Sequence, residues 1–139
     1  MKKTFGLILF ILFIVSCDKK EEVKFEAFSP EAFAYELGDS WEVNATVNVK
    51  GFKKVENEKG FSASIDYSVD LTKPDGDTNE KVFNDNKEIT DTELDDIQLE
   101  AQFELDSTYQ TGKYKLIFNI LDNNSGEHAE ITADLDLSE

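Results

Sequence analysis

The chain has 139 residues, which is enough for one domain. It carries 30 acidic residues against 14 lysines and no arginine, so its net charge of −16 repels nucleic acid, whose binding requires clustered cations. Its single cysteine excludes an intramolecular disulfide.

The first sixteen residues have the form of a secretory signal peptide. Lys2 and Lys3 precede an almost purely apolar run from Phe5 to Val15. That run is shorter than the roughly 20 apolar residues that span a bilayer. It fits the apolar region of a secretory signal, which is about 7–15 residues long. We therefore expect residues 1–16 to be removed, which leaves 12 lysines against 30 acids and a net charge of −18.

The residues that end this segment carry a second signal. Ile14-Val15-Ser16-Cys17 resembles the lipobox of bacterial lipoproteins, with an aliphatic residue three positions before the cysteine and a small residue just before it. The resemblance implies that Cys17 is linked to diacylglycerol, becomes the mature N-terminus and is then acylated. A lipid with two or three chains anchors stably, whereas one chain binds only marginally. We expect no cofactor beyond this covalent lipid.

Residues 17–32 are predicted to form the lipidated cysteine and an acidic tether, ahead of a β-sandwich domain over residues 33–139. Within the tether, Lys20-Glu21-Glu22 resembles the export signal of surface-exposed lipoproteins of the Bacteroidota, a lysine followed by two acids. This resemblance implies a lipid-anchored protein of the outer membrane that is exposed at the cell surface.

The segment from Val23 to Gly38 permits two interpretations. Ser29-Pro30-Glu31 could begin a helix that ends at Gly38. The apolar residues Phe33, Tyr35 and Leu37 stand at alternate positions and also permit a strand. We expect an extended lead-in with at most one helical turn.

From Trp41 onward, apolar and polar residues alternate. This period of two predicts strands with one face on a core and one in water, the antiparallel case. The alternating segments are Trp41–Lys50, Phe61–Leu71, Ile97–Leu105, Lys113–Ile120 and Ile131–Leu137.

The connections complete an all-β prediction of about seven strands. Lys73–Asp77 and Asp122–Gly126 are turn signals. Gly51–Gly60 is expected to be a polar loop, and Asn84–Asp96 an acidic connection after a short strand at Val82-Phe83. The pattern predicts an antiparallel, immunoglobulin-like Greek-key β-sandwich, with other small antiparallel barrels or sandwiches as alternatives. Gly112-Lys113-Tyr114 resembles the tyrosine corner of immunoglobulin-like domains.

Few residues suggest chemistry. His128 is the only histidine, and no serine has the setting of a nucleophile, so we expect no catalytic site and no enzyme. Asp75, Asp77 and Asn79 offer oxygen ligands at alternate positions, as calcium loops do. The following residues depart from the EF-hand pattern, however, and an ordinary acidic turn is favoured.

Two further surface features can be read from the sequence. Asp106-Ser107-Thr108 matches the short acceptor motif for O-glycosylation in Bacteroidota lipoproteins, which makes Ser107 a candidate glycosylation site. Phe52, Phe83 and Tyr109 lie in or near connections and are the aromatic residues expected to make exposed contacts.

These observations favour a non-catalytic accessory subunit that docks on a larger outer-membrane protein, in transport or secretion. The alternative is a glycan- or calcium-binding surface module. The last strand, Ala129–Leu137, is expected to lie at a sheet edge. Its acidic outward residues would accept a lysine-bearing partner.

Overall fold

The computed structural model describes residues 23–139, which form eight β-strands and no helix. All strand pairs are antiparallel. The strands are β1 (Glu26–Glu36), β2 (Trp41–Lys50), β3 (Val55–Asn57), β4 (Gly60–Thr72), β5 (Thr78–Asp91), β6 (Asp96–Leu105), β7 (Gly112–Asp122) and β8 (His128–Leu137). The predicted all-β antiparallel fold is confirmed.

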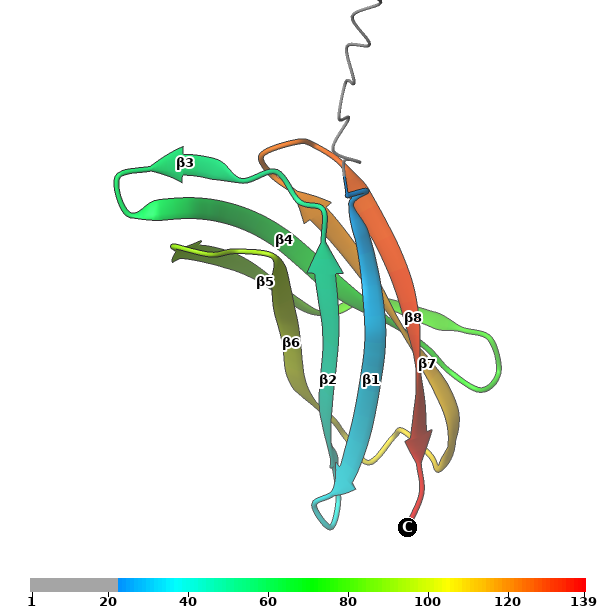
Figure 1. Cartoon of the computed structure of the whole chain (residues 1–139). Coiled ribbons are helices and arrows are strands. Elements are labelled where there is room, and N and C mark those ends of the chain that lie inside the picture. Colours follow the sequence, from blue (N-terminus) through cyan, green and yellow to red (C-terminus); the bar gives the residue numbers. More distant parts are fainter. Residues whose placement is uncertain (1–22) are drawn as a thin grey trace, which may run out of the picture.

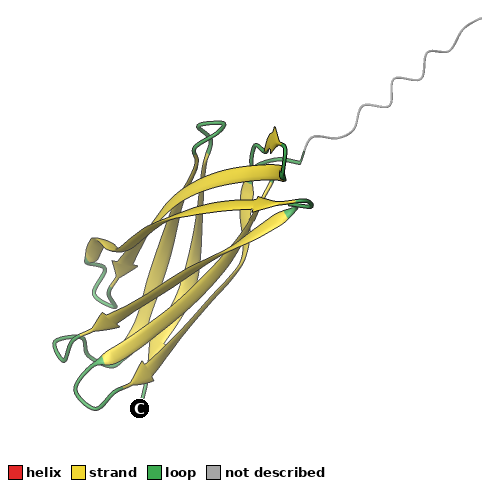
Figure 2. Cartoon of the chain, turned by 90° about the vertical axis from the view of Figure 1, so that its left-hand side faces the viewer, coloured by secondary structure: helices red, strands yellow, loops and turns green. Residues whose placement is uncertain are grey.

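The strands form two sheets. One has the order β1-β2-β6. The other has the order β3-β4-β7-β8, and β5 also pairs with β4, outside this path. Figure 1 shows β1 running beside β8, so the edge of one sheet lies along the edge of the other. Figure 2 shows the strands running lengthwise, with the connections gathered at the ends.

The hydrophobic core lies between the sheets, where the sequence pattern predicts it. In β2, all five alternate apolar residues from Trp41 to Val49 are buried, and their polar neighbours are not. The same alternation buries one face of β4, β6, β7 and β8. Burial of each large aliphatic or aromatic side chain contributes about 1.5–3 kcal/mol. A slip of one residue would turn these side chains to solvent, so their burial fixes the register of each strand.

Two tyrosine hydroxyls satisfy backbone carbonyls at the border of this core. Tyr114 donates to the carbonyl of Gln110 at 2.7 Å, the hydrogen bond that defines a tyrosine corner. Tyr67 of β4 donates to the carbonyl of Glu100 in β6 at 2.6 Å and so connects the two sheets. The immunoglobulin-like arrangement itself stays a prediction.

Strand β5 differs from the expectation for its region. Residues 84–91, expected to lie in an acidic connection, continue a 14-residue strand paired with β4 from Asp91 opposite Phe61. Only Val82, Phe83 and Ile89 of this strand pack partly against the core. Because β5 is held mainly by backbone pairing along an edge, it carries no alternating pattern that the sequence could show.

Strand β1 also begins earlier than expected and contains no helical turn. It starts at Glu26, so residues 26–32, assigned to the tether from sequence, belong to the first sheet. The register with β2 shifts between Phe28 and Glu31, and Ser29 there has a φ of 52°. Pro30 has no N–H to donate, and a bulge on an edge strand accommodates that.

The Gly51–Gly60 connection is less open than expected. It contains the short strand β3, and Phe52 is only 5% exposed. The expectation of an exposed contact at Phe52 is therefore wrong. Phe83 and Tyr109 are half-buried, and each ring packs near another aromatic ring, at 6.0 Å from Tyr67 and 6.3 Å from Tyr114 between centroids.

Candidate functional site

Four residues of the predicted address lie outside the described residues: Cys17, Lys20, Glu21 and Glu22. Ser107, the candidate glycosylation site, lies in the exposed turn between β6 and β7. Asp106 shapes this turn by accepting the N–H of Thr108 at 2.9 Å. The Thr108 hydroxyl also donates to this carboxylate, and these hydrogen bonds lower the pKa of Asp106.

The candidate calcium residues are engaged with their own surroundings. The Asp75 carboxylate accepts the N–H of Asp77 at 2.9 Å, and the amide of Asn79 donates to the Tyr109 hydroxyl at 2.7 Å. Within residues 23–139, no group of three or more His, Cys, Asp or Glu side chains is arranged to hold a metal ion. Asp75 and Asp77 lie in the turn between β4 and β5, and Asn79, at the start of β5, links this region to the β6–β7 connection through Tyr109.

His128 stands in a shallow polar hollow beside β5. The hollow measures about 740 Å³, and its lining includes Asp66 and Asp85. Hydrogen bonds from Asn123 and Asn86 lower the pKa of Asp66. No serine or threonine hydroxyl is hydrogen-bonded to His128 in the described part of the chain, so nothing there arranges it as the base of a nucleophile.

The outer face of the β1-β2-β6 sheet carries exposed aromatic residues, which the sequence did not indicate. Phe33 and Tyr35 of β1 point outward and are 58% and 57% exposed, while Ala32 and Ala34 pack against the core. Large apolar residues outside and small ones inside reverse the usual pattern of a sheet. Leu37, just beyond β1, is 49% exposed and extends the apolar stripe.

Strand register places these rings within three rows of side chains that cross the sheet. The rows run Glu31-Thr46-Glu100, Phe33-Asn44-Gln102 and Tyr35-Glu42-Glu104. We call these nine residues the aromatic–acidic face. Successive rows on one face lie about 7 Å apart, since each residue of a strand rises about 3.3 Å.

Hydrogen bonds fix the polar part of this face. One carboxylate oxygen of Glu42 accepts the amide of Asn44 at 3.0 Å and the amide of Gln102 at 3.1 Å. Four carboxylates and no lysine stand in the three rows. A shallow depression of about 260 Å³ lies beside Phe33. The face thus offers two exposed rings on a rigid sheet within a field of negative charge.

Comparison with known proteins assigns no family. No family model and no curated protein match the chain. A solved structure of a Bordetella pertussis protein assigned as ApaA is similar over 82% of this chain and 94% of its own, with 11% identity and a TM-score of 0.46.

Two other solved structures are less similar. A structural-genomics target, SoR45, matches over 83% of this chain and 86% of its own, with 15% identity and a TM-score of 0.42. The Pseudomonas fluorescens alkylpurine DNA glycosylase AlkC, bound to DNA with an abasic-site analogue, matches over 83% of this chain but 30% of its own, with 17% identity and a TM-score of 0.37. Likenesses this low assign no activity to the chain.

Proposed function

We propose that this protein is a lipid-anchored, non-catalytic outer-membrane lipoprotein that acts as an accessory interaction subunit of a larger outer-membrane assembly. In this proposal Cys17 carries the lipid, and Lys20-Glu21-Glu22 directs the protein to the cell surface. The folded domain docks on a neighbouring membrane protein of a transport or secretion system. No helix among residues 23–139 is long and apolar enough to cross a membrane.

The aromatic–acidic face is the observation that carries the proposal. Large exposed apolar groups that stand together on a surface often mark interaction sites, and aromatic residues are enriched where partners bind most strongly. Phe33 and Tyr35 belong to a strand whose backbone is already paired with β2, so little backbone freedom is lost when a partner covers them.

The charge of the face suggests the chemistry of its partner. The carboxylates of Glu31, Glu42, Glu100 and Glu104 surround the rings on one sheet face. A lysine or arginine from a partner can lie over an aromatic ring and pair with a neighbouring carboxylate. We therefore assign the face to a basic surface of an outer-membrane protein.

This assignment moves the docking surface away from the last strand. The outward residues of β8 are acidic and exposed, as predicted from Ala129–Leu137. However, β1 runs along β8, and Lys113 already pairs with Asp136. The outer face of the β1-β2-β6 sheet carries the exposed rings of Phe33 and Tyr35, whereas the outward residues of β8 include no large apolar side chain.

Crosslinking in intact cells, followed by purification in mild detergent, tests the proposal. The wild-type protein should be recovered in a stoichiometric complex, and the double variant Phe33→Ser with Tyr35→Ser should lose it. Val55→Ser is the matched control, because Val55 is an exposed apolar residue of β3 that lies on the other sheet. An equally stable complex in the double variant would contradict docking through this face.

One observation favours glycan binding as the second candidate. The rings of Phe33 and Tyr35 stand beside a fixed array of amide and carboxylate groups. Proteins bind sugars by packing an aromatic ring against the C–H groups of the sugar and by hydrogen-bonding its hydroxyls with polar side chains. Glycan affinity that disappears in the same double variant, with only monomer recovered from cells, would favour this alternative.

A further inference from the structure

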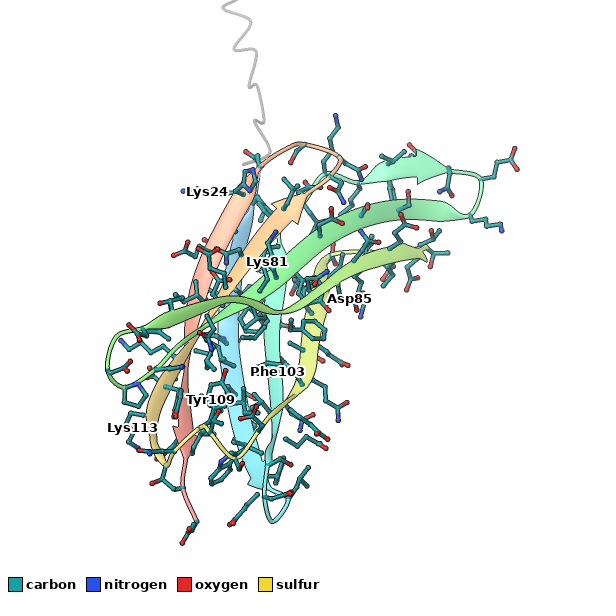
Figure 3. All side chains as sticks on the ribbon, turned by 180° about the vertical axis from the view of Figure 1, so that it is seen from behind. Lys24, Lys81, Asp85, Phe103, Tyr109 and Lys113 are labelled. Atoms are coloured by element: carbon teal, nitrogen blue, oxygen red, sulfur yellow. The ribbon has the colours of Figure 1, made fainter. Side chains whose placement is uncertain are left out.

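A hollow lies at the end of the domain where the described chain begins. It measures about 1030 Å³ and is lined by Lys24, Lys50, Lys53 and Lys54, with Phe25 and Phe52 among its apolar residues. We call it the N-terminal hollow. Figure 3 shows Lys24 at this end of the domain, and Tyr109 and Lys113 toward the opposite end.

The charge of the N-terminal hollow differs from that of the rest of the domain. Residues 23–139 contain ten lysines against 27 acids. Four of the ten lysines line this hollow, together with three acids, Asp95, Asp96 and Glu127. The hollow is therefore locally close to neutral or positive on a domain that is strongly negative. In an external field, this end turns toward negative charge and the rest of the domain turns away.

A buried carboxylate holds the lysine-bearing loop in place. Asp122, at the end of β7, has no exposed surface and accepts the N–H of Lys53 at 2.7 Å. It also accepts the hydroxyl of Ser125 at 2.7 Å and the N–H of Asn124 at 3.1 Å. The amide of Asn124 returns a hydrogen bond to the carbonyl of Lys53 at 3.0 Å. Both backbone groups of Lys53 are thus fixed by the β7–β8 turn.

The N-terminal segment is seated against the same loop. Gly51 has a φ of +73°, and a Cβ on it would lie 2.2 Å from the carbonyl oxygen of Lys24. Only glycine allows this approach without a shift of the backbone. The close contact brings Lys24 into the hollow beside Lys50, Lys53 and Lys54.

The distance to the membrane is limited by the chain itself, given the lipid on Cys17 on which this inference rests. Val23, which also lines the hollow, is six residues beyond Cys17. Six residues span at most about 22 Å when fully extended. The N-terminal hollow therefore stays within that distance of the lipid at all times.

We propose that the N-terminal hollow docks on the phosphate groups of anionic lipids in the membrane that holds the anchor. Lys50 and Lys54 form ion pairs with Glu26 at 2.9 Å and Asp95 at 3.4 Å, and both pairs are exposed. Exposed pairs of this kind contribute little and can yield to phosphate. The docked domain stands with this end on the lipid and with its acidic remainder directed outward.

Lysine labelling of the lipidated full-length protein tests this orientation. The protein is inserted into vesicles of phosphatidylcholine alone, or of phosphatidylcholine with added phosphatidylglycerol, and treated with an amine-reactive reagent. Mass spectrometry should show Lys24 and Lys53 reacting about fivefold more slowly in the anionic vesicles, the ratio expected for a lysine held at an anionic surface. Lys73 and Lys113, away from the hollow, should react equally in both.

Variants separate docking from simple proximity. Lys53→Gln with Lys54→Gln should remove the protection of Lys24, whereas the matched pair Lys113→Gln with Lys115→Gln should leave it intact. Equal labelling of Lys24 in both kinds of vesicle overturns the inference while leaving the anchor in place. Failure of the protein to float with either vesicle overturns the anchor, and the inference with it.

Discussion

Replacing Asp122 with alanine should destabilise the domain by about 2–4 kcal/mol. The carboxylate is fully buried and accepts three hydrogen bonds. Hydrogen bonds to a charged group contribute about 1.5–3 kcal/mol each. The sum is reduced because alanine also removes the cost of burying a charge, and because Lys53 and Ser125 are exposed enough for water to reach them.

Urea unfolding at neutral pH measures this loss. Trp41 is the only tryptophan and is 7% exposed in β2, so its fluorescence reports on the core. Asp122→Asn should be intermediate, because its amide nitrogen cannot accept the hydrogen bonds that a carboxylate oxygen accepts. Asp75→Ala, which removes a carboxylate from an exposed turn, is the control and should cost less than about 1 kcal/mol.

A loss below about 1 kcal/mol for Asp122→Ala would refute this reasoning, since that is the range of ordinary surface substitutions. It would mean that the β7–β8 turn and the Lys53 loop hold together without the carboxylate. A change in the urea slope, rather than in the midpoint alone, would instead indicate that the variant alters the compactness of the folded or unfolded state.

Three further predictions concern the anchor, the core and the tyrosines. Cys17→Ser should leave an unlipidated precursor, because a hydroxyl cannot replace the thiol in lipid transfer, and mass spectrometry of the N-terminus checks this. Phe118→Ala should cost about 3–5 kcal/mol in urea unfolding, since the ring is fully buried; a loss below about 1 kcal/mol would place the ring outside the core. Burial raises the pKa of Tyr67 and Tyr114 above the usual 10.0. Their contribution to stability is therefore complete below pH 10 and is lost as the pH rises through the raised values. Absorbance titration of Tyr67→Phe should show one fewer late-titrating tyrosine.

Much of the fold follows from the sequence alone, because most strands have one buried face and one solvent-exposed face. In β2, β4, β6, β7 and β8, that asymmetry repeats every second residue and marks both the strand and its inward side. Tyr114 is identifiable for a similar reason, since its corner is made with Gln110, only four residues away. Such local relations need no knowledge of the rest of the fold.

Features that depend on distant partners could not be predicted in this way. Strand β5 exists because β4 pairs with it, and its own residues carry little sign of that pairing. The outward direction of Phe33 and Tyr35 cannot be read from the sequence, because β1 alternates between large and small apolar residues and either set could face a core. The register with β2 decides that the alanines face inward, because Ala32 and Ala34 stand opposite the buried Ala45 and Val43.

The N-terminal hollow depends on tertiary structure to the same degree. Asp122 lies in a turn signal, and from sequence it is one more acid among 30. It becomes a buried hydrogen-bond acceptor only because the loop that carries Lys53, 69 residues away in the sequence, folds over it. Lys24 joins Lys50, Lys53 and Lys54 because antiparallel pairing of β1 with β2 brings the start of one strand to the end of the other. Composition fixes the net charge of a chain, but the pairing of strands decides where its few cations gather.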